Sequence, residues 1–183
     1  VNSKKFNRVI AIVRKPYFND NENIEEIIVD FNTESPLKSL NQVNHVFCCL
    51  GSTIKKAGSK KAFRFVDFDL PLSFARWAEQ KKCDSFSLVT SMGADSKSKI
   101  FYNRIKGEIE DEISKISILK IQIFRPSLIM GDRKEFRLGE LLGKGVFSLL
   151  NPFMFGRLRK YKAIHARDIA QGMVAHLTNN QFK

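Results

Sequence analysis

Runs of apolar residues alternate with segments of helical periodicity along this chain. The apolar runs are rich in β-branched and aromatic residues and are continuous, as expected for strands that are covered on both faces of a sheet. We predict five such strands, over 8–14, 25–31, 45–52, 85–91 and 120–127. Helices are predicted over about 65–81, over about 99–117 and from Asp168 onward. Strands that alternate with helices indicate a parallel sheet with right-handed crossovers.

The pattern predicts a doubly wound, Rossmann-like α/β fold with helices on both faces of the sheet. Ligands of such folds bind at the carboxyl ends of the strands. We expect residues 1–183 to form one domain, with a small substrate-side portion over about 127–183. In the helix over 65–81, Asp67 is expected as a cap and Pro71 near the first turns. The acidic run 108–112 is interpreted as a solvated helix face.

The composition is that of a soluble globular protein, with 43% apolar and 27% charged residues. No apolar run approaches the roughly 20 residues of a membrane helix, so no membrane association is expected. Two of the three cysteines, Cys48 and Cys49, are adjacent in an apolar run and are interpreted as buried strand residues. This usage favours a reducing compartment, and we expect the cytoplasm. The three histidines are scattered, and no metal site is predicted.

The net charge of +12 is compatible with nucleic acid, anionic lipid or a phosphorylated ligand. A lysine-rich surface that only keeps the protein soluble is an equal alternative. Basic residues cluster over 55–64 and 156–162, without a zinc-ligand pattern or an aromatic nucleic-acid signature. Nucleic acid therefore ranks below a small phosphorylated ligand.

Three residues form a candidate catalytic group at the predicted strand ends. Ser91 ends the fourth strand, and Tyr102 and Lys106 lie one turn apart on one face of the following helix. A nearby ammonium favours the phenolate and so improves a tyrosine as a general acid-base. The Ser91 hydroxyl can hydrogen-bond the same substrate oxygen. Such a group suits carbonyl reduction or alcohol oxidation with hydride carried by a nicotinamide.

The ordered motifs of the chain resemble the short-chain dehydrogenase/reductase superfamily, and most closely its atypical, Tat-interacting-protein-like branch. The resemblance rests on "FCCLGST" (47–53), "VTSMGADSKS" (89–98), "YNRIKGEIE" (102–110) and "FRPSLIMGDR" (124–133). It implies an NAD(P)-binding Rossmann fold. It also implies that Tyr102 is the general acid-base, that Lys106 holds the ribose hydroxyls, and that Ser91 positions the substrate carbonyl. Thr90 is the alternative to Ser91.

The same resemblance assigns cofactor contacts to the other strand ends. Asp30 resembles the acid at the adenine edge, and Gly51 and Ser52, with Thr53 beside them, the turn past the adenosine ribose. The segment beside the nicotinamide amide corresponds to Pro126, Ser127 and Leu128.

The choice between the two nicotinamide cofactors follows from charge. An acid after the second strand of such a fold binds a free ribose 2′-hydroxyl, whereas an arginine suits a 2′-phosphate. Arg14 and Lys15 occupy this place, without an acid beside them. We therefore expect NADP(H) over NAD(H).

The family's first strand and its glycine-rich turn have no counterpart in this sequence. We expect the natural protein to carry roughly 20–30 more residues at its amino end, which would complete a βαβ unit.

Two functions remain open at this point. The first is an NADP(H)-dependent oxidoreductase that acts on a small carbonyl or alcohol. The alternative is a cofactor-binding regulatory or interaction protein with little or no turnover. A homodimer is left open.

Overall fold

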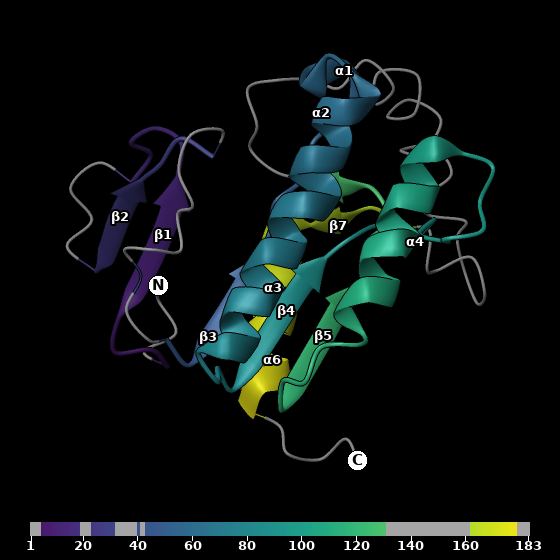
Figure 1. Cartoon of the computed structure of the whole chain (residues 1–183). Helices are drawn as coiled ribbons and strands as arrows, with labels where there is room; N and C mark the ends of the chain where they lie inside the picture. Colours follow the sequence, from purple (N-terminus) through teal and green to yellow (C-terminus); the bar gives the residue numbers. More distant parts are fainter. Residues whose placement is uncertain (1–4, 19–22, 32–39, 41–42, 131–161, 179–183) are drawn as a thin grey trace. The chain divides into compact units, whose positions relative to one another are not determined.

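Parallel strands and helices alternate in the part of the chain that the computed structural model describes, residues 5–18, 23–31, 40, 43–130 and 162–178 (Figure 1). The strands are β1 (Val9–Val13), β2 (Ile24–Ile28), β3 (His45–Cys48), β4 (Ser85–Val89), β5 (Lys120–Phe124), β6 (Ile129–Met130) and β7 (Ile164–His165). The helices are α1 (Ile54–Ala57), α2 (Lys60–Arg64), α3 (Leu70–Gln80), α4 (Phe101–Ile113) and α6 (Ala166–Thr178), with the π-helical turn η1 (Phe65–Asp69) between α2 and α3. None of these helices is long and apolar enough to cross a bilayer.

The chain divides into two compact units, residues 1–42 and 43–183. In the first unit, β1 and β2 pair in parallel from Val9 opposite Ile24 to Val13 opposite Ile28. In the second unit, β3, β4 and β5 form a parallel sheet in that order, and β6 and β7 form a separate parallel pair. The α/β class and the parallel strands are thus confirmed. One domain over 1–183 stays a prediction, and most of its expected substrate-side portion lies outside the described residues.

The sheet of the second unit is covered by helices on both faces. Successive side chains of a strand point to opposite faces, so the apolar residues Val46, Cys48, Phe86, Leu88, Ile121 and Ile123 share one face. Helices α3 and α4 lie over that face (Figure 1). On the other face α6 packs against β5, where the Phe124 ring lies 6.0 Å from the His176 ring. This buried sheet supports the strand ends discussed below.

The helix predicted over 65–81 is longer and contains a π-turn. It begins at α2, where the Ser59 side chain caps Ala62 N–H, and continues through η1 into α3. Pro71 lies in the first turn of α3, as predicted. Proline removes a backbone donor inside a helix, and the π-turn just before it loosens the hydrogen-bond ladder there. Asp67 is therefore not a cap: it lies within η1 and is buried.

Helix α4 matches the helix predicted over 99–117 and is tightly packed by the loop that follows β4. A Cβ atom at Gly107 would lie 2.0 Å from Ser96 N and 2.7 Å from Asp95 Cα. The Asp95 N–H also donates to the Asn103 carbonyl at 3.0 Å. Only glycine allows this approach of the loop backbone to the helix. The loop after Ser91 is thus fixed to α4.

The other predicted strands and helices are confirmed, with ends that shift by a few residues. The third predicted strand, over 45–52, ends at Cys48, and the last helix begins at Ala166, just before Asp168. Helices α1 and α2 and the short strands β6 and β7 were not predicted, because each is too short to show a period.

Gly107→Ala should destabilise the protein by about 1–3 kcal/mol, since the added methyl group displaces the backbone at 95–96. Urea unfolding measures this change. Gly172→Ala in α6 is the matched control, because its Cβ would meet only Phe124 Cε1 at 3.8 Å, an ordinary contact. That change should be neutral or stabilise the helix by about 0.5–1 kcal/mol. Equal effects of the two substitutions would contradict the close approach at Gly107.

Candidate active site

The carboxyl ends of β3, β4 and β5 lie at one edge of the sheet, because the strands are parallel and adjacent. Gly51 follows β3, Ser91 follows β4 and Pro126 follows β5. The segments after β4 and β5 stay paired beyond the strands, since Met92 N–H donates to the Pro126 carbonyl at 3.0 Å. The structure therefore brings three of the predicted site segments to one edge.

A buried ion pair joins α4 to η1, and a hydrogen bond joins η1 to the turn after β3. Lys106 Nζ lies 2.7 Å from Asp67 Oδ1, and the two side chains are 5% and 0% exposed. Asp67 Oδ2 accepts a 2.8 Å hydrogen bond from Ser52 N–H. A Cβ at Gly51 would lie 3.4 Å from Asp67 Oδ1 and 3.6 Å from Lys106 Nζ. The Gly51–Ser52 turn thus lies against the ion pair.

This pair changes the interpretation of Lys106. A buried ammonium loses its hydration and needs a counter-charge and hydrogen bonds to remain charged. Asp67 supplies the charge, and an ammonium has three donors, so further N–H groups remain for other acceptors. Sequence reasoning missed Asp67 as a functional residue. The signal in the sequence is an acid between the apolar residues Val66 and Phe68, and such an acid near a helix start equally predicts a cap.

Tyr102 lies one turn before Lys106 on α4 and is half-buried. Its ring packs on the fully buried Phe63 ring at a centroid distance of 5.4 Å. Among the described residues, no hydrogen bond joins the Tyr102 hydroxyl to a neighbour. The ring is held by packing, and the hydroxyl stays available for a ligand.

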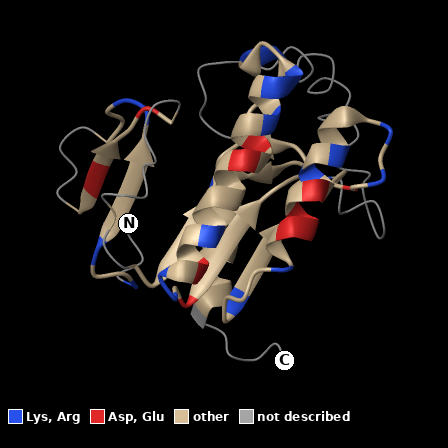
Figure 2. Cartoon of the chain, in the orientation of Figure 1, with Lys and Arg blue, Asp and Glu red and all other residues tan. Residues whose placement is uncertain are grey.

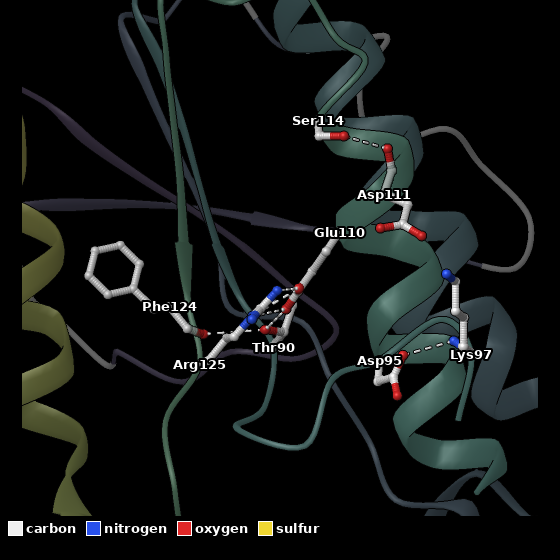
Figure 3. Close-up of polar contacts among 8 residues, drawn as sticks. All are labelled: Thr90, Asp95, Lys97, Glu110, Asp111, Ser114, Phe124 and Arg125. Atoms are coloured by element: carbon white, nitrogen blue, oxygen red, sulfur yellow. Dashed lines mark hydrogen bonds and ion pairs between the residues drawn. The ribbon is translucent and has the colours of Figure 1, made fainter. Parts of the chain in front are cut away.

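Ser91 and Thr90, the two hydroxyl residues after β4, differ in their partners. Thr90 Oγ1 donates to Glu110 Oε1 at 2.5 Å and is buried (Figure 3). Ser91 Oγ is buried and has no hydrogen-bond partner in the described part of the chain. A buried hydroxyl without a partner costs free energy unless a ligand satisfies it. The geometry leaves the Ser91 hydroxyl, and not that of Thr90, able to form a hydrogen bond with a ligand.

The acidic run 108–112 is not wholly a solvated face, which corrects the expectation for Glu110. Glu110 is 5% exposed and binds Arg125 through Nε, at 2.9 and 3.1 Å, and through the terminal guanidinium nitrogen (Figure 3). This hydrogen bonding with Glu110 raises the pKa of the Arg125 guanidinium. Glu108, two residues earlier, is half-buried and pairs with Arg64 at 2.7 Å.

The other predicted cofactor-binding residues of the second unit form local hydrogen bonds that fix the backbone. Thr53 caps α1, where its hydroxyl accepts from Lys56 N–H at 3.1 Å. Ser127 Oγ donates to the Lys162 carbonyl, and the Leu128 carbonyl accepts from Ile164 N–H at 2.9 Å. These bonds fix Ser127 and Leu128 beside the segment at 162–164. The hydrogen bond from Met92 N–H to the Pro126 carbonyl fixes Pro126 beside Met92.

The residues predicted to meet the adenine edge and the 2′-phosphate lie in the first unit. Arg14 and Lys15 follow β1 directly and are exposed, and Asp30 lies just after β2 and is exposed. The parallel register places Arg14 and Asp30 at the same end of the two strands. The structure groups these residues with one another and does not relate them to the second unit.

The cysteines behave differently from one another. Cys48 is buried in β3, and burial raises the pKa of its thiol to about 12. It is a core residue, as expected, and is not a thiolate nucleophile at neutral pH. Cys49 was expected to be a buried strand residue, but it follows the end of β3 and is exposed, since the strand stops one residue earlier. Among the described residues, no group of three or more histidine, cysteine, aspartate or glutamate side chains could hold a metal.

Positive charge gathers on α1 and α2, and negative charge on the later part of α4 (Figure 2). The lysines of the first basic cluster, Lys55, Lys56, Lys60 and Lys61, are exposed. Lys60 Nζ lies 5.3 Å from the centroid of the Phe101 ring. The second cluster falls outside the described residues except for Lys162.

Comparison with known proteins identifies the family. A family model described as HIM1 matches residues 1–156. The chain belongs to the HIM1 family. Protein HTATIP2 of Rattus norvegicus is 35% identical over 149 residues, which are 79% of this chain and 61% of the relative. Protein FMP52, mitochondrial, of Eremothecium gossypii is 28% identical over 155 residues, 79% of this chain and 69% of the relative. This HIM1-family chain thus spans about three fifths of the rat protein.

Solved structures establish the fold of this HIM1-family member. WbmG of Bordetella bronchiseptica, in complex with NAD and UDP, matches with a TM-score of 0.68 at 9% identity, over 96% of this chain and 62% of that one. A short chain dehydrogenase family protein of Francisella tularensis matches with a TM-score of 0.59 at 15% identity, over 95% and 81%. The fold is that of Rossmann NAD-binding epimerases and short-chain dehydrogenases. The resemblance inferred from the sequence is confirmed.

Lys106→Met should destabilise this HIM1-family protein by about 3–5 kcal/mol, because it leaves the buried Asp67 carboxylate without the Lys106 counter-charge. The double variant D67N/K106M should lose less than Lys106→Met alone, since no charge then remains buried. Urea unfolding of both variants measures the coupling. Lys115→Met is the control on the segment after α4, because its pair with Glu112 is exposed (67% at Lys115) and should contribute less than about 1 kcal/mol. A loss for Lys106→Met as small as that of the control would contradict the buried pair.

Proposed function

We propose that this protein is an NADP(H)-dependent oxidoreductase that interconverts a small carbonyl compound and its alcohol. The observation that carries the proposal is the buried Lys106 ammonium, held by Asp67 against the Gly51–Ser52 turn at the strand ends. Tyr102 lies one turn away on the same helix, and just after β4 lies the Ser91 hydroxyl, which has no hydrogen-bond partner among the described residues. Membership of the HIM1 family and the fold of NAD-binding structures support the class of cofactor.

The residues present fit a nicotinamide cofactor. The remaining Lys106 donors suit ribose hydroxyls, and the exposed Gly51 leaves the turn open to a ligand. When bound, the nicotinamide supplies or accepts hydride. Ser91 donates a hydrogen bond to the substrate oxygen, and Tyr102 delivers or removes its proton. Lys106 keeps a positive charge near the phenol, and Asp67 holds Lys106 in place.

The second proposal within this function concerns the cofactor. Arg14 and Lys15 are exposed at the end of β1, where a 2′-phosphate would meet two cations. The WbmG structure contains NAD, so the preference for NADP rests on Arg14 and Lys15 of this chain. We also propose the cytoplasm as the compartment of this protein, because its cysteines are free. The relative from Eremothecium gossypii carries "mitochondrial" in its name, and fractionation of cells that express the full protein tests the compartment.

Tyr102→Phe should lower kcat by about 10²–10⁴-fold, because it removes the proton donor. The Kd for NADPH should stay within about twofold, since the phenyl ring keeps its contact with Phe63. Steady-state kinetics on a panel of aldehydes and ketones, with nucleotide fluorescence for binding, measures both. Unchanged turnover in this variant, or NADPH binding by a wild-type protein that turns over none of the panel, would favour a cofactor-binding regulator instead.

Arg14→Glu should weaken NADPH binding by about 10- to 100-fold and NADH binding far less, because only NADPH brings a 2′-phosphate to that strand end. Fluorescence titration of the full-length protein with each nucleotide measures the two constants. Arg8→Glu, at the other end of β1, is the control and should leave both constants unchanged. Tighter binding of NADH than of NADPH by the wild-type protein would overturn the assignment of NADP.

A further inference from the structure

Glu110 is a buried carboxylate that the proposed chemistry does not use. It lies one turn after Lys106 on α4 and is 5% exposed. It accepts hydrogen bonds from Thr90 Oγ1 at 2.5 Å and from Arg125 Nε at 2.9 and 3.1 Å, and it forms an ion pair with the Arg125 guanidinium (Figure 3). One side chain of α4 therefore binds the ends of both β4 and β5.

The contact of Glu110 with Thr90 and Arg125 does more than fill space in the core. Burial of a carboxylate is costly, and an apolar residue of similar volume would often be as stable or more stable. The Arg125 side chain is 56% exposed, so its charge alone does not require a buried partner. The carboxylate adds directional hydrogen bonds. Its two oxygens accept from Thr90 and Arg125 in fixed directions, which sets where these two side chains lie.

The two partners of Glu110 immediately precede the groups of the candidate site. Thr90 precedes Ser91, and Arg125 precedes Pro126. Backbone hydrogen bonds from Thr90 N–H to the Phe124 carbonyl, at 2.9 Å, and from Met92 N–H to the Pro126 carbonyl, at 3.0 Å, bracket Ser91. Ser91 is thus held between two backbone bonds and beside a side-chain contact to the helix that carries Tyr102.

We propose that Glu110 is a positioning residue: through Thr90 and Arg125 it fixes Ser91 relative to Tyr102 on α4. The inference rests on the proposed oxidoreductase function for its effect on turnover. Its geometric part, the fixing of the strand ends, stands without that function. A displacement of a reacting group by about 1 Å can lower a rate by about 100-fold. A small loosening of Ser91 should therefore reduce kcat while the cofactor still binds.

The test compares Glu110→Gln with Glu108→Gln in the full-length protein. Both changes remove one carboxylate from α4, but Glu108 pairs with Arg64 on the half-exposed side of the helix. Amide hydrogen exchange of Thr90 and Met92 is measured with and without NADPH, together with the NADPH Kd and steady-state kinetics on the carbonyl panel. Glu110→Gln should speed exchange at both amides and lower kcat by about 10- to 100-fold, with KM and the NADPH Kd within about twofold. Glu108→Gln should change none of these values.

The outcomes separate this inference from the proposed function. Wild-type exchange rates at Thr90 and Met92 in Glu110→Gln would overturn the fixing of the strand ends, whatever the turnover. Faster exchange with unchanged kcat, in an active enzyme, would overturn the positioning role and leave a purely structural contact. A wild-type protein that binds no NADPH would sink the proposed function, while the exchange comparison would still decide the geometry.

Thr90→Val provides a second route if Glu110→Gln does not fold. It removes only the hydroxyl that donates a hydrogen bond to Glu110, and it keeps the Glu110–Arg125 pair. It should reproduce the faster exchange at Met92 and the lower kcat. Thr90→Ser keeps the hydroxyl and should restore both, which a role in packing alone would not predict. Wild-type exchange in Thr90→Val would contradict the inference.

Discussion

The buried ion pair between Lys106 and Asp67 is the constraint on which the rest of the candidate site depends. Two charges removed from water must meet each other and satisfy their remaining hydrogen-bonding groups, so small displacements are costly. This requirement fixes η1, α4 and the Gly51–Ser52 turn relative to one another. The π-turn before Pro71 gives Asp67 its place within an otherwise continuous helix. The π-turn and the burial of one charge thus build the same corner of the site.

Helix α4 connects this corner to the rest of the sheet edge. Lys106 and Glu110 lie one turn apart, and each binds a different group of elements. Lys106 binds Asp67 of η1, which in turn binds the turn after β3, and Glu110 binds the ends of β4 and β5. Gly107, between them, admits the loop backbone that follows Ser91. Along little more than one turn of helix, the chain places two buried charges and one glycine. Their contacts hold every segment of the second unit that the proposed chemistry uses.

This chain shares its family and its Rossmann fold with its relatives, but the reaction that it could catalyse depends on the side chains of its site. The fold supports many reactions, so the class of reaction must be argued from side chains. Three features of this chain carry it: the buried ion pair of Lys106 with Asp67, and the hydroxyls of Tyr102 and Ser91, which have no hydrogen-bond partner among the described residues. The buried Ser91 hydroxyl is costly unless a ligand satisfies it, which supports a binding site over a surface helix.

The sequence by itself determined the α/β class, the main strands and helices, and the spacing of Tyr102 and Lys106, because hydrophobic period and helix geometry are local properties. It did not determine the partners of the buried charges. Asp67 was read as a cap and Glu110 as part of a solvated face, since charge in a sequence says nothing about burial. Only the tertiary structure, which brings 67 to 106 and 90 and 125 to 110, decided that both are buried and paired. Such contacts join residues far apart along the chain, and no local pattern encodes them.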